Sequence, residues 1–203
     1  HHITAIEGGM IVTDNYELYC LMKSMRAHGW TRDLPKNNVL NYNSKKGLYE
    51  QYNFILPGYN LRPTEISATA GIEQLKKLNK MINVRNKNLE LFNKLFKNDE
   101  RFIIQKSKYF SSSFSFPIIF KKKFSKSYKK IFFNLLKKNN IDFRLITGGC
   151  FTEHPYKKYF NYQIYKNLKN SKKAHRDGFF VGNASINLSK EIKKFHNIIK
   201  NIK

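Results

Sequence analysis

The sequence predicts a mixed fold of helices and strands, in which a mainly helical first half is followed by a small α+β domain. Three observations indicate this fold class. The chain of 203 residues is 41% hydrophobic, which is enough to bury a core and too much for a disordered segment. Before residue 97, apolar residues recur mainly at helical spacing. After residue 101, short β-rich segments alternate with amphipathic helices.

The first half begins with an apolar segment, residues 10–12, that we expect to form a strand. Thr13 and Asp14 supply an N-cap signal for a following helix, which should end near Gly29. Four apolar residues at helical spacing predict the buried face of that helix: Leu18, Leu21, Met22 and Met25.

Residues 31–56 have no clear period, so we expect a long loop, and long loops in compact domains often carry function. Pro63 stands where the first position of the next helix is expected, because its fixed φ suits that position. Helical spacing continues from Glu65 through Leu78, and a further helical stretch covers residues 81–96.

Four segments of the second half are rich in β-forming residues and predict strands: 102–105, 111–120, 142–146 and 179–181. Residues 128–136 predict an amphipathic helix. A terminal helix should begin near Ser189 and bury Ile192, Phe195 and Ile199 on one face.

The formal net charge of +24 is unevenly distributed about an expected domain joint at residues 97–101. Residues 1–100 hold 14 Lys and Arg against 10 Asp and Glu, whereas residues 101–203 hold 24 against 4. Such a surface attracts polyanions, including nucleic acid and nucleotide diphosphates. The cations are mostly lysines scattered on helix faces, and aromatics interleaved with Arg are not evident, so we do not expect specific nucleic-acid binding.

Other functional classes are excluded by missing signals. No apolar run approaches the roughly 20 residues of a membrane helix. Cys20 and Cys150 are far apart and match no metal-ligand spacing, so we expect no metal site, no disulfide framework and a cytoplasmic location. The sequence begins at His1, inside what reads as a continuing element, so we expect the C-terminal portion of something longer.

Three polar segments punctuated by glycine stand out: HHITAIEGG at 1–9, RAHGWTR at 26–32 and LPGYNLRPTE at 56–65. In this order and spacing they resemble the DegT/DnrJ/EryC1/StrS family of pyridoxal-phosphate (PLP)-dependent sugar aminotransferases and dehydratases. The resemblance implies the C-terminal part of a type I PLP-dependent transferase (aspartate aminotransferase) fold. Residues 1–97 would then end the large PLP-binding domain, and residues 98–203 would form the small α+β domain.

The resemblance places His1 where the family's aminotransferases carry the Lys that bonds covalently to the cofactor, and where its dehydratases carry a His. An imidazole with a pKa near 6.5 can move a proton at neutral pH but cannot form that bond. The family likeness therefore implies PLP/PMP-dependent 3-dehydration of a nucleotide-linked 4-keto-6-deoxy sugar, expected to be GDP-linked. Glutamate would be the amino donor, His1 the base and His2 a structural neighbour.

The resemblance also matches Arg32 and Asn60 to residues that reach from one subunit to the PLP phosphate of the other, which implies a homodimer with shared active sites. Arg62 resembles the residue that faces the amino-donor carboxylate. His28 has two interpretations, a residue of the substrate pocket or a polar residue at a helix end. Taken alone, Asn60 also suits a turn and Arg32 a solvated loop.

Two further segments, FRLITGG at 143–149 and FFVGN at 179–183, resemble the family's substrate-side segments. Two alternative functions remain open. The first is a sugar-nucleotide aminotransferase of the same family, which would require Lys in place of His1. The second is a non-catalytic basic binding fragment, because the segments that the family places before this His are absent from the sequence and its second half is strongly basic. His1 and His2 also resemble a tag remnant, but ITAIEGG continues the family pattern without a break.

Overall fold

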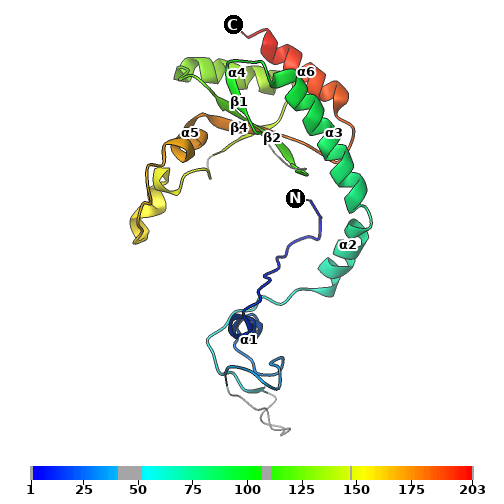
Figure 1. Cartoon of the computed structure of the whole chain (residues 1–203), viewed down its shortest axis with the longest axis vertical. Coiled ribbons are helices and arrows are strands. Elements are labelled where there is room, and N and C mark those ends of the chain that lie inside the picture. The colour runs from blue at the N-terminus through cyan, green and yellow to red at the C-terminus, as the bar shows by residue number, and fades with distance from the viewer. Residues whose placement is uncertain (1, 41–51, 107–110, 147, 203) are drawn as a thin grey trace. The chain divides into compact units, whose positions relative to one another are not determined.

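The computed structural model describes residues 2–40, 52–106, 111–146 and 148–202. Its internal contacts divide the chain into two units. Figure 1 shows the chain coloured by residue number, from blue at the N-terminus to red at the C-terminus. The N-terminal unit consists of residues 3–76, and the sheet unit consists of residues 1–2 and 77–203.

The sheet unit is built on an antiparallel sheet of four strands in the order β1-β2-β4-β3. The strands are β1 (Phe102–Ile104), β2 (Ser115–Phe120), β3 (Phe143–Leu145) and β4 (Gly178–Gly182). Ser115 pairs with Gly182, and Phe143 pairs with Val181, so β4 is held on both edges. Strands β1, β2 and β3 lie within segments that the sequence predicts to be β-rich, and β4 extends one residue beyond each end of its predicted segment, 179–181.

Helices α3 (Leu78–Phe96), α4 (Lys126–Lys138) and α6 (Ser189–Lys200) pack their apolar faces on this sheet (Figure 1). The predicted face of the terminal helix is confirmed, since its three apolar residues are almost fully buried: Ile192, Phe195 and Ile199. Helical periodicity identified these residues because a helix returns to the same face every three to four residues.

One helix and two short 3₁₀ segments were not expected from the sequence: α5 (Lys169–Asp177), η2 (Phe151–Glu153) and η3 (Pro155–Tyr159). The α5 sequence, KNSKKAHRD, contains no apolar stripe that would predict a helix. Ion pairs help to hold its last turn, because Asp177 lies 2.5 Å from the Lys129 Nζ and 3.5 Å from the Lys173 Nζ.

Residues near the expected joint at 97–101 clamp the last helix to the sheet. The Arg101 Nη1 atom donates to the carbonyl oxygens of Ile199 (3.0 Å), in the last turn of α6, and Ile202 (2.8 Å), just beyond the helix. Asp99 pairs with the same guanidinium at 2.7 Å. The contacts divide the chain after Lys76, and α3 belongs to the sheet unit. The assignment of 1–97 and 98–203 to the large and small domains stays a prediction.

The N-terminal unit contains helices α1 (Tyr16–Met25) and α2 (Glu65–Leu75). Their N-caps differ from those predicted. Asn15 caps α1, because its side-chain oxygen accepts from the Leu18 N–H at 3.0 Å. Thr64 caps α2 in the same way, so Pro63 precedes the cap and does not occupy the first helical position.

Two further expectations for the N-terminal unit are wrong. The fully buried residues of α1 are Cys20 and Ser24, whereas Leu18 is 48% exposed, because spacing predicts a stripe but not which neighbours cover it. Residues 10–12 do not form a strand and are 76–88% exposed. A strand needs a hydrogen-bonding partner, and these residues have none in the ranges that the structure describes.

Candidate functional site

Two of the three glycine-punctuated segments lie side by side in the N-terminal unit. Isolated β-bridges join Ala27 to Asn60 and Trp30 to Phe54. Five backbone hydrogen bonds connect the two segments: His28 N to Tyr59 O (2.8 Å), Tyr59 N to Met25 O (2.7 Å), Leu61 N to Arg26 O (2.8 Å), Ile55 N to Gly29 O (2.9 Å) and Thr31 N to Asn53 O (3.1 Å). We call this arrangement the paired segments, residues 25–32 and 53–62.

The paired segments approach each other so closely that two positions require glycine. Gly29 has φ of +81°, and a Cβ atom there would lie 1.7 Å from the Leu56 carbonyl oxygen. A Cβ atom on Gly58 would lie 2.2 Å from the Gly29 nitrogen. His28 also has a positive φ, of 64°, so two consecutive left-handed residues reverse the chain after α1.

Four of the five predicted site residues lie on the paired segments: His28, Arg32, Asn60 and Arg62. All four are exposed. The Arg32 guanidinium carbon lies 5.2 Å from the centre of the Trp30 ring, which stacks on Phe54 at 5.8 Å. The bridge to Ala27 sets Asn60 beside the His28 turn. The fifth predicted residue, His1, lies outside the described residues.

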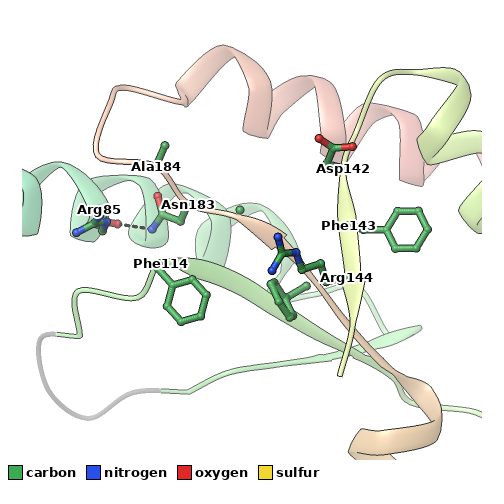
Figure 2. A pocket seen from close by; sticks show the side chains of 9 residues that line it. Arg85, Phe114, Asp142, Phe143, Arg144, Asn183 and Ala184 are labelled. Carbon is green, nitrogen blue, oxygen red and sulfur yellow. Dashed lines mark hydrogen bonds between the residues drawn. The ribbon is translucent and has the colours of Figure 1, made fainter. Parts of the chain in front are cut away.

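A cavity of about 650 Å³ opens in the sheet unit (Figure 2). It lies between α3, the segment before β2, and strands β3 and β4. The residues that line it include two arginines, one aspartate, one asparagine and three phenylalanines: Arg85, Phe114, Asp142, Phe143, Arg144, Phe180, Gly182, Asn183 and Ala184. The segments FRLITGG and FFVGN, singled out in the sequence, therefore contribute to one cavity wall.

A buried amide network supports this wall. Asn183 donates from Nδ2 to the carbonyl oxygens of Arg85 (3.0 Å, dashed in Figure 2) and Ser113 (2.8 Å). Asn88, on α3, donates to the Asn183 Oδ1 at 3.0 Å and accepts from the Leu188 N–H at 3.1 Å. Asn88 is 3% exposed and Asn183 is 2% exposed, so each amide depends on protein partners for its hydrogen bonds.

His2 lies at the margin of the cavity, because it contacts two of the lining residues. Its Nδ1 atom lies 3.3 Å from the Arg85 Nη1 and 3.3 Å from the Ser112 Oγ. Its ring meets Phe114 edge to face at 6.0 Å. Burial and the Arg85 guanidinium lower the pKa of His2 below its usual 6.5.

Sequence reasoning missed Arg85, Arg144 and Asn183 as residues of one site. Arg85 lies on α3, Arg144 lies on β3 and Asn183 directly follows β4, and no local spacing connects these three positions. The two substrate-side segments were the available signal. Only the pairing of β3 with β4 brings those segments together.

The sequence profile of the DegT/DnrJ/EryC1/StrS aminotransferase family matches residues 1–194. The chain belongs to this family. The predicted family membership, made from three short segments, is therefore confirmed.

The chain is 42% identical, over 202 residues, to the GDP-4-keto-6-deoxy-D-mannose 3-dehydratase of Escherichia coli O55:H7, with 98% of this chain and 52% of the relative covered. A solved structure of the E. coli enzyme with bound hydrated PLP has a TM-score of 0.89 and 40% identity, covering 100% of this chain and 52% of that one. A second structure of GDP-4-keto-6-deoxymannose-3-dehydratase, with a trapped PLP-glutamate geminal diamine, gives the same values.

These matches confirm the predicted PLP-dependent aminotransferase fold. The chain spans about half the length of the curated relatives it matches. In the described parts of this family member, no helix is both long and apolar enough to cross a membrane. Cys20 and Cys150 are buried and unpaired.

Proposed function

We propose that this chain carries the catalytic His of a PLP/PMP-dependent enzyme that removes the C3 oxygen of a nucleotide-linked 4-keto-6-deoxy sugar. The sugar is expected to be GDP-linked, with glutamate as the amino donor. One observation carries the proposal: the chain is 42% identical to a 3-dehydratase over 98% of its length. The family resemblance matches His1, in the first segment, to the position where the aminotransferases carry Lys.

The donors of the paired segments suit a cofactor phosphate. Arg32 is exposed and supported by Trp30, and Asn60 is exposed on a backbone fixed by hydrogen bonds. Neither side chain has a hydrogen bond to another described residue. A guanidinium and an amide donate well to a phosphate dianion. These residues therefore fit the phosphate of PLP.

The ring of the cofactor would be held by other parts of the protein. The family resemblance directs Arg32 and Asn60 to the cofactor of the other subunit. We therefore include in the proposal a homodimer with shared active sites, in which each subunit completes the phosphate site of its partner. Arg62, exposed beyond Asn60, would bind a glutamate carboxylate, and His28 would face the substrate.

The proposed chemistry divides between cofactor and protein. When bound, the cofactor stores the electron pair of a broken C–H bond, which lets the C3 hydroxyl leave. His1 would accept and return the proton, because an imidazole with a pKa near neutrality is partly unprotonated at pH 7. Since imidazole cannot bond to PLP as Lys does, His1 would leave the cofactor free to react with the sugar.

The cavity of the sheet unit suits the substrate. Its volume of about 650 Å³ falls within the range of about 300–1,000 Å³ of small-molecule sites. Arg85 and Arg144 offer positive charge to a diphosphate, and Asp142 can accept hydrogen bonds from sugar hydroxyls. Arg85 also contacts His2, the chain neighbour of His1. The proposed substrate site thus adjoins the segment that carries the proposed base.

Product stoichiometry tests this function. The protein expressed from its complete gene would be given PLP, glutamate and GDP-4-keto-6-deoxymannose. Loss of the C3 oxygen as water, followed by hydrolytic release of the amino group, consumes one glutamate and no net water. We expect one 2-oxoglutarate and one ammonia for each 3-deoxy sugar. A sugar aminotransferase instead gives 2-oxoglutarate and an amino sugar without ammonia.

Two other outcomes would reject the proposal. A natural mass near 24.1 kDa, without PLP binding, would favour the non-catalytic fragment. Salt-sensitive binding of DNA without turnover would favour the basic binding module. The cytoplasmic location stays part of the proposal, supported by the two buried, unpaired cysteines.

A further inference from the structure

The contacts of His2 determine which of its nitrogens carries a proton. Arg85 contacts Nδ1 through Nη1 at 3.3 Å. A guanidinium has donors and no acceptor, so Nδ1 must be the acceptor in this contact. The Ser112 hydroxyl, also 3.3 Å from Nδ1, can donate to the same lone pair. A neutral imidazole has one N–H, which must then lie on Nε2.

The groups around His2 are fixed by the buried amide network. Arg85 is 5% exposed, and its carbonyl oxygen accepts from Asn183. Asn183 also donates to the carbonyl oxygen of Ser113, which follows Ser112 in the chain. The backbone N–H of Asn183 donates to the Phe114 carbonyl oxygen at 2.7 Å. Asn183 therefore hydrogen-bonds to the backbone of both segments that contact His2, α3 and residues 112–114.

We propose that Arg85 is a positioning residue that holds His2 as the uncharged tautomer with its proton on Nε2, and so keeps a positive charge off the immediate neighbour of His1. The tautomer is inferred from geometry alone. Its value for catalysis rests on the proposed function, in which His1 is the base. Arg85 thus has two roles, since the same side chain lines the substrate cavity.

The charge on His2 matters because the two imidazoles are consecutive in the chain. A protonated His2 would repel a second proton and make His1 a weaker base. Among the described residues, the side chains that contact His2 are Arg85 from α3 and Ser112 and Phe114 from the segment before β2. Arg85 is the charged group of these three, and it disfavours a proton on Nδ1.

The tautomer can be measured directly in the wild-type protein. Protein expressed from its complete gene would be labelled with ¹⁵N in the histidine side chains, and long-range ¹H–¹⁵N spectra would be recorded across a pH titration. The His2 signals would be assigned by their loss in His2→Asn. We expect an unprotonated Nδ1, a protonated Nε2 and a titration midpoint below 6.5. A proton on Nδ1 at neutral pH would overturn the inference without any variant of Arg85.

Two substitutions separate the hydrogen bond from the charge. Arg85→Gln keeps an N–H donor and should keep the tautomer while raising the midpoint of His2. Arg85→Met removes donor and charge, so it should raise the midpoint further and allow a proton on Nδ1. Arg144→Met is the matched control, because it removes the other cavity guanidinium and should leave the His2 spectrum unchanged. Equal midpoints in wild type and Arg85→Gln would refute the role of Arg85.

Failure of this inference is distinguishable from failure of the proposed function. If the protein forms 3-deoxy sugar and ammonia while His2 carries its proton on Nδ1, only the positioning role is wrong. If the Nε2–H tautomer is found in a protein without dehydratase activity, the structural inference holds and the proposed function fails. A folded Arg85→Gln variant with an unchanged pH profile of dehydration would refute the catalytic part of the inference.

Discussion

Replacing Asn183 with Ala should destabilise the sheet unit by about 3 kcal/mol. The Asn183 side chain makes three hydrogen bonds, two donated to the carbonyl oxygens of Arg85 and Ser113 and one accepted from Asn88. Each neutral hydrogen bond contributes about 1 kcal/mol net, and partners left buried without water lose more. Asn183 is 2% exposed, so water cannot replace the missing groups without opening the structure.

Hydrogen exchange measured by mass spectrometry would test this value in the full-length protein. Peptides covering β2 and β4 should exchange roughly 100-fold faster in Asn183→Ala, since 1.4 kcal/mol corresponds to a factor of ten. Asn161→Ala is the matched control, because Asn161 is exposed and has no side-chain hydrogen bond to a described residue. If both variants exchange at the same rate, the amide network does not support the cavity wall.

Three further predictions concern the cofactor, the paired segments and acid stability. His1→Asn should lower the rate of dehydration by a factor of about 10²–10⁴ and leave PLP bound, as judged by turnover and by absorbance. His1→Lys should instead bond covalently to PLP, so the mass of the protein should rise by that of PLP after borohydride reduction. If no adduct forms, residue 1 does not lie beside the cofactor. Gly58→Ala should weaken PLP binding by more than tenfold, or about 1.4 kcal/mol, because its Cβ would lie 2.2 Å from backbone, whereas Gly148→Ala, with open space at that position, should bind normally. Burial raises the pKa of Asp177, but Lys129 and Lys173 outweigh it and hold that pKa below 3.8. Stability from this pair is thus complete above about pH 4 and lost as pH falls through the lowered pKa, so Lys129→Met should unfold at a higher pH than wild type in an acid titration, and an unchanged midpoint would contradict the pairing.

The proposed phosphate-binding residues and the proposed substrate cavity lie on different kinds of structure. The paired segments are loops held by backbone hydrogen bonds, and they present exposed donors such as Arg32 and Asn60. The cavity lies over a packed sheet, and its groups are held by buried amides. In the proposed function, the paired segments would bind a cofactor phosphate and the cavity would bind the substrate.

The sequence by itself determined most of the helices and all four strands of the described sheet. Local patterns were sufficient because a helix and a strand each repeat within a few residues, as the buried face of α6 illustrates. The family could also be recognised from three short segments, since glycines and polar residues at fixed positions are specific in combination. His1, Arg32 and Asn60 were found in this way, and their roles stay proposals.

Tertiary structure decided which distant residues meet. The cavity combines Arg85, Arg144 and Asn183 because strand register and helix packing bring them together, and no local spacing encodes that. The same holds for Gly58, whose necessity is visible only when the paired segments approach within atomic contact. Residues 10–12 have an apolar, β-rich pattern but do not form a strand. Such a pattern forms a strand only where a partner is available to share its backbone hydrogen bonds.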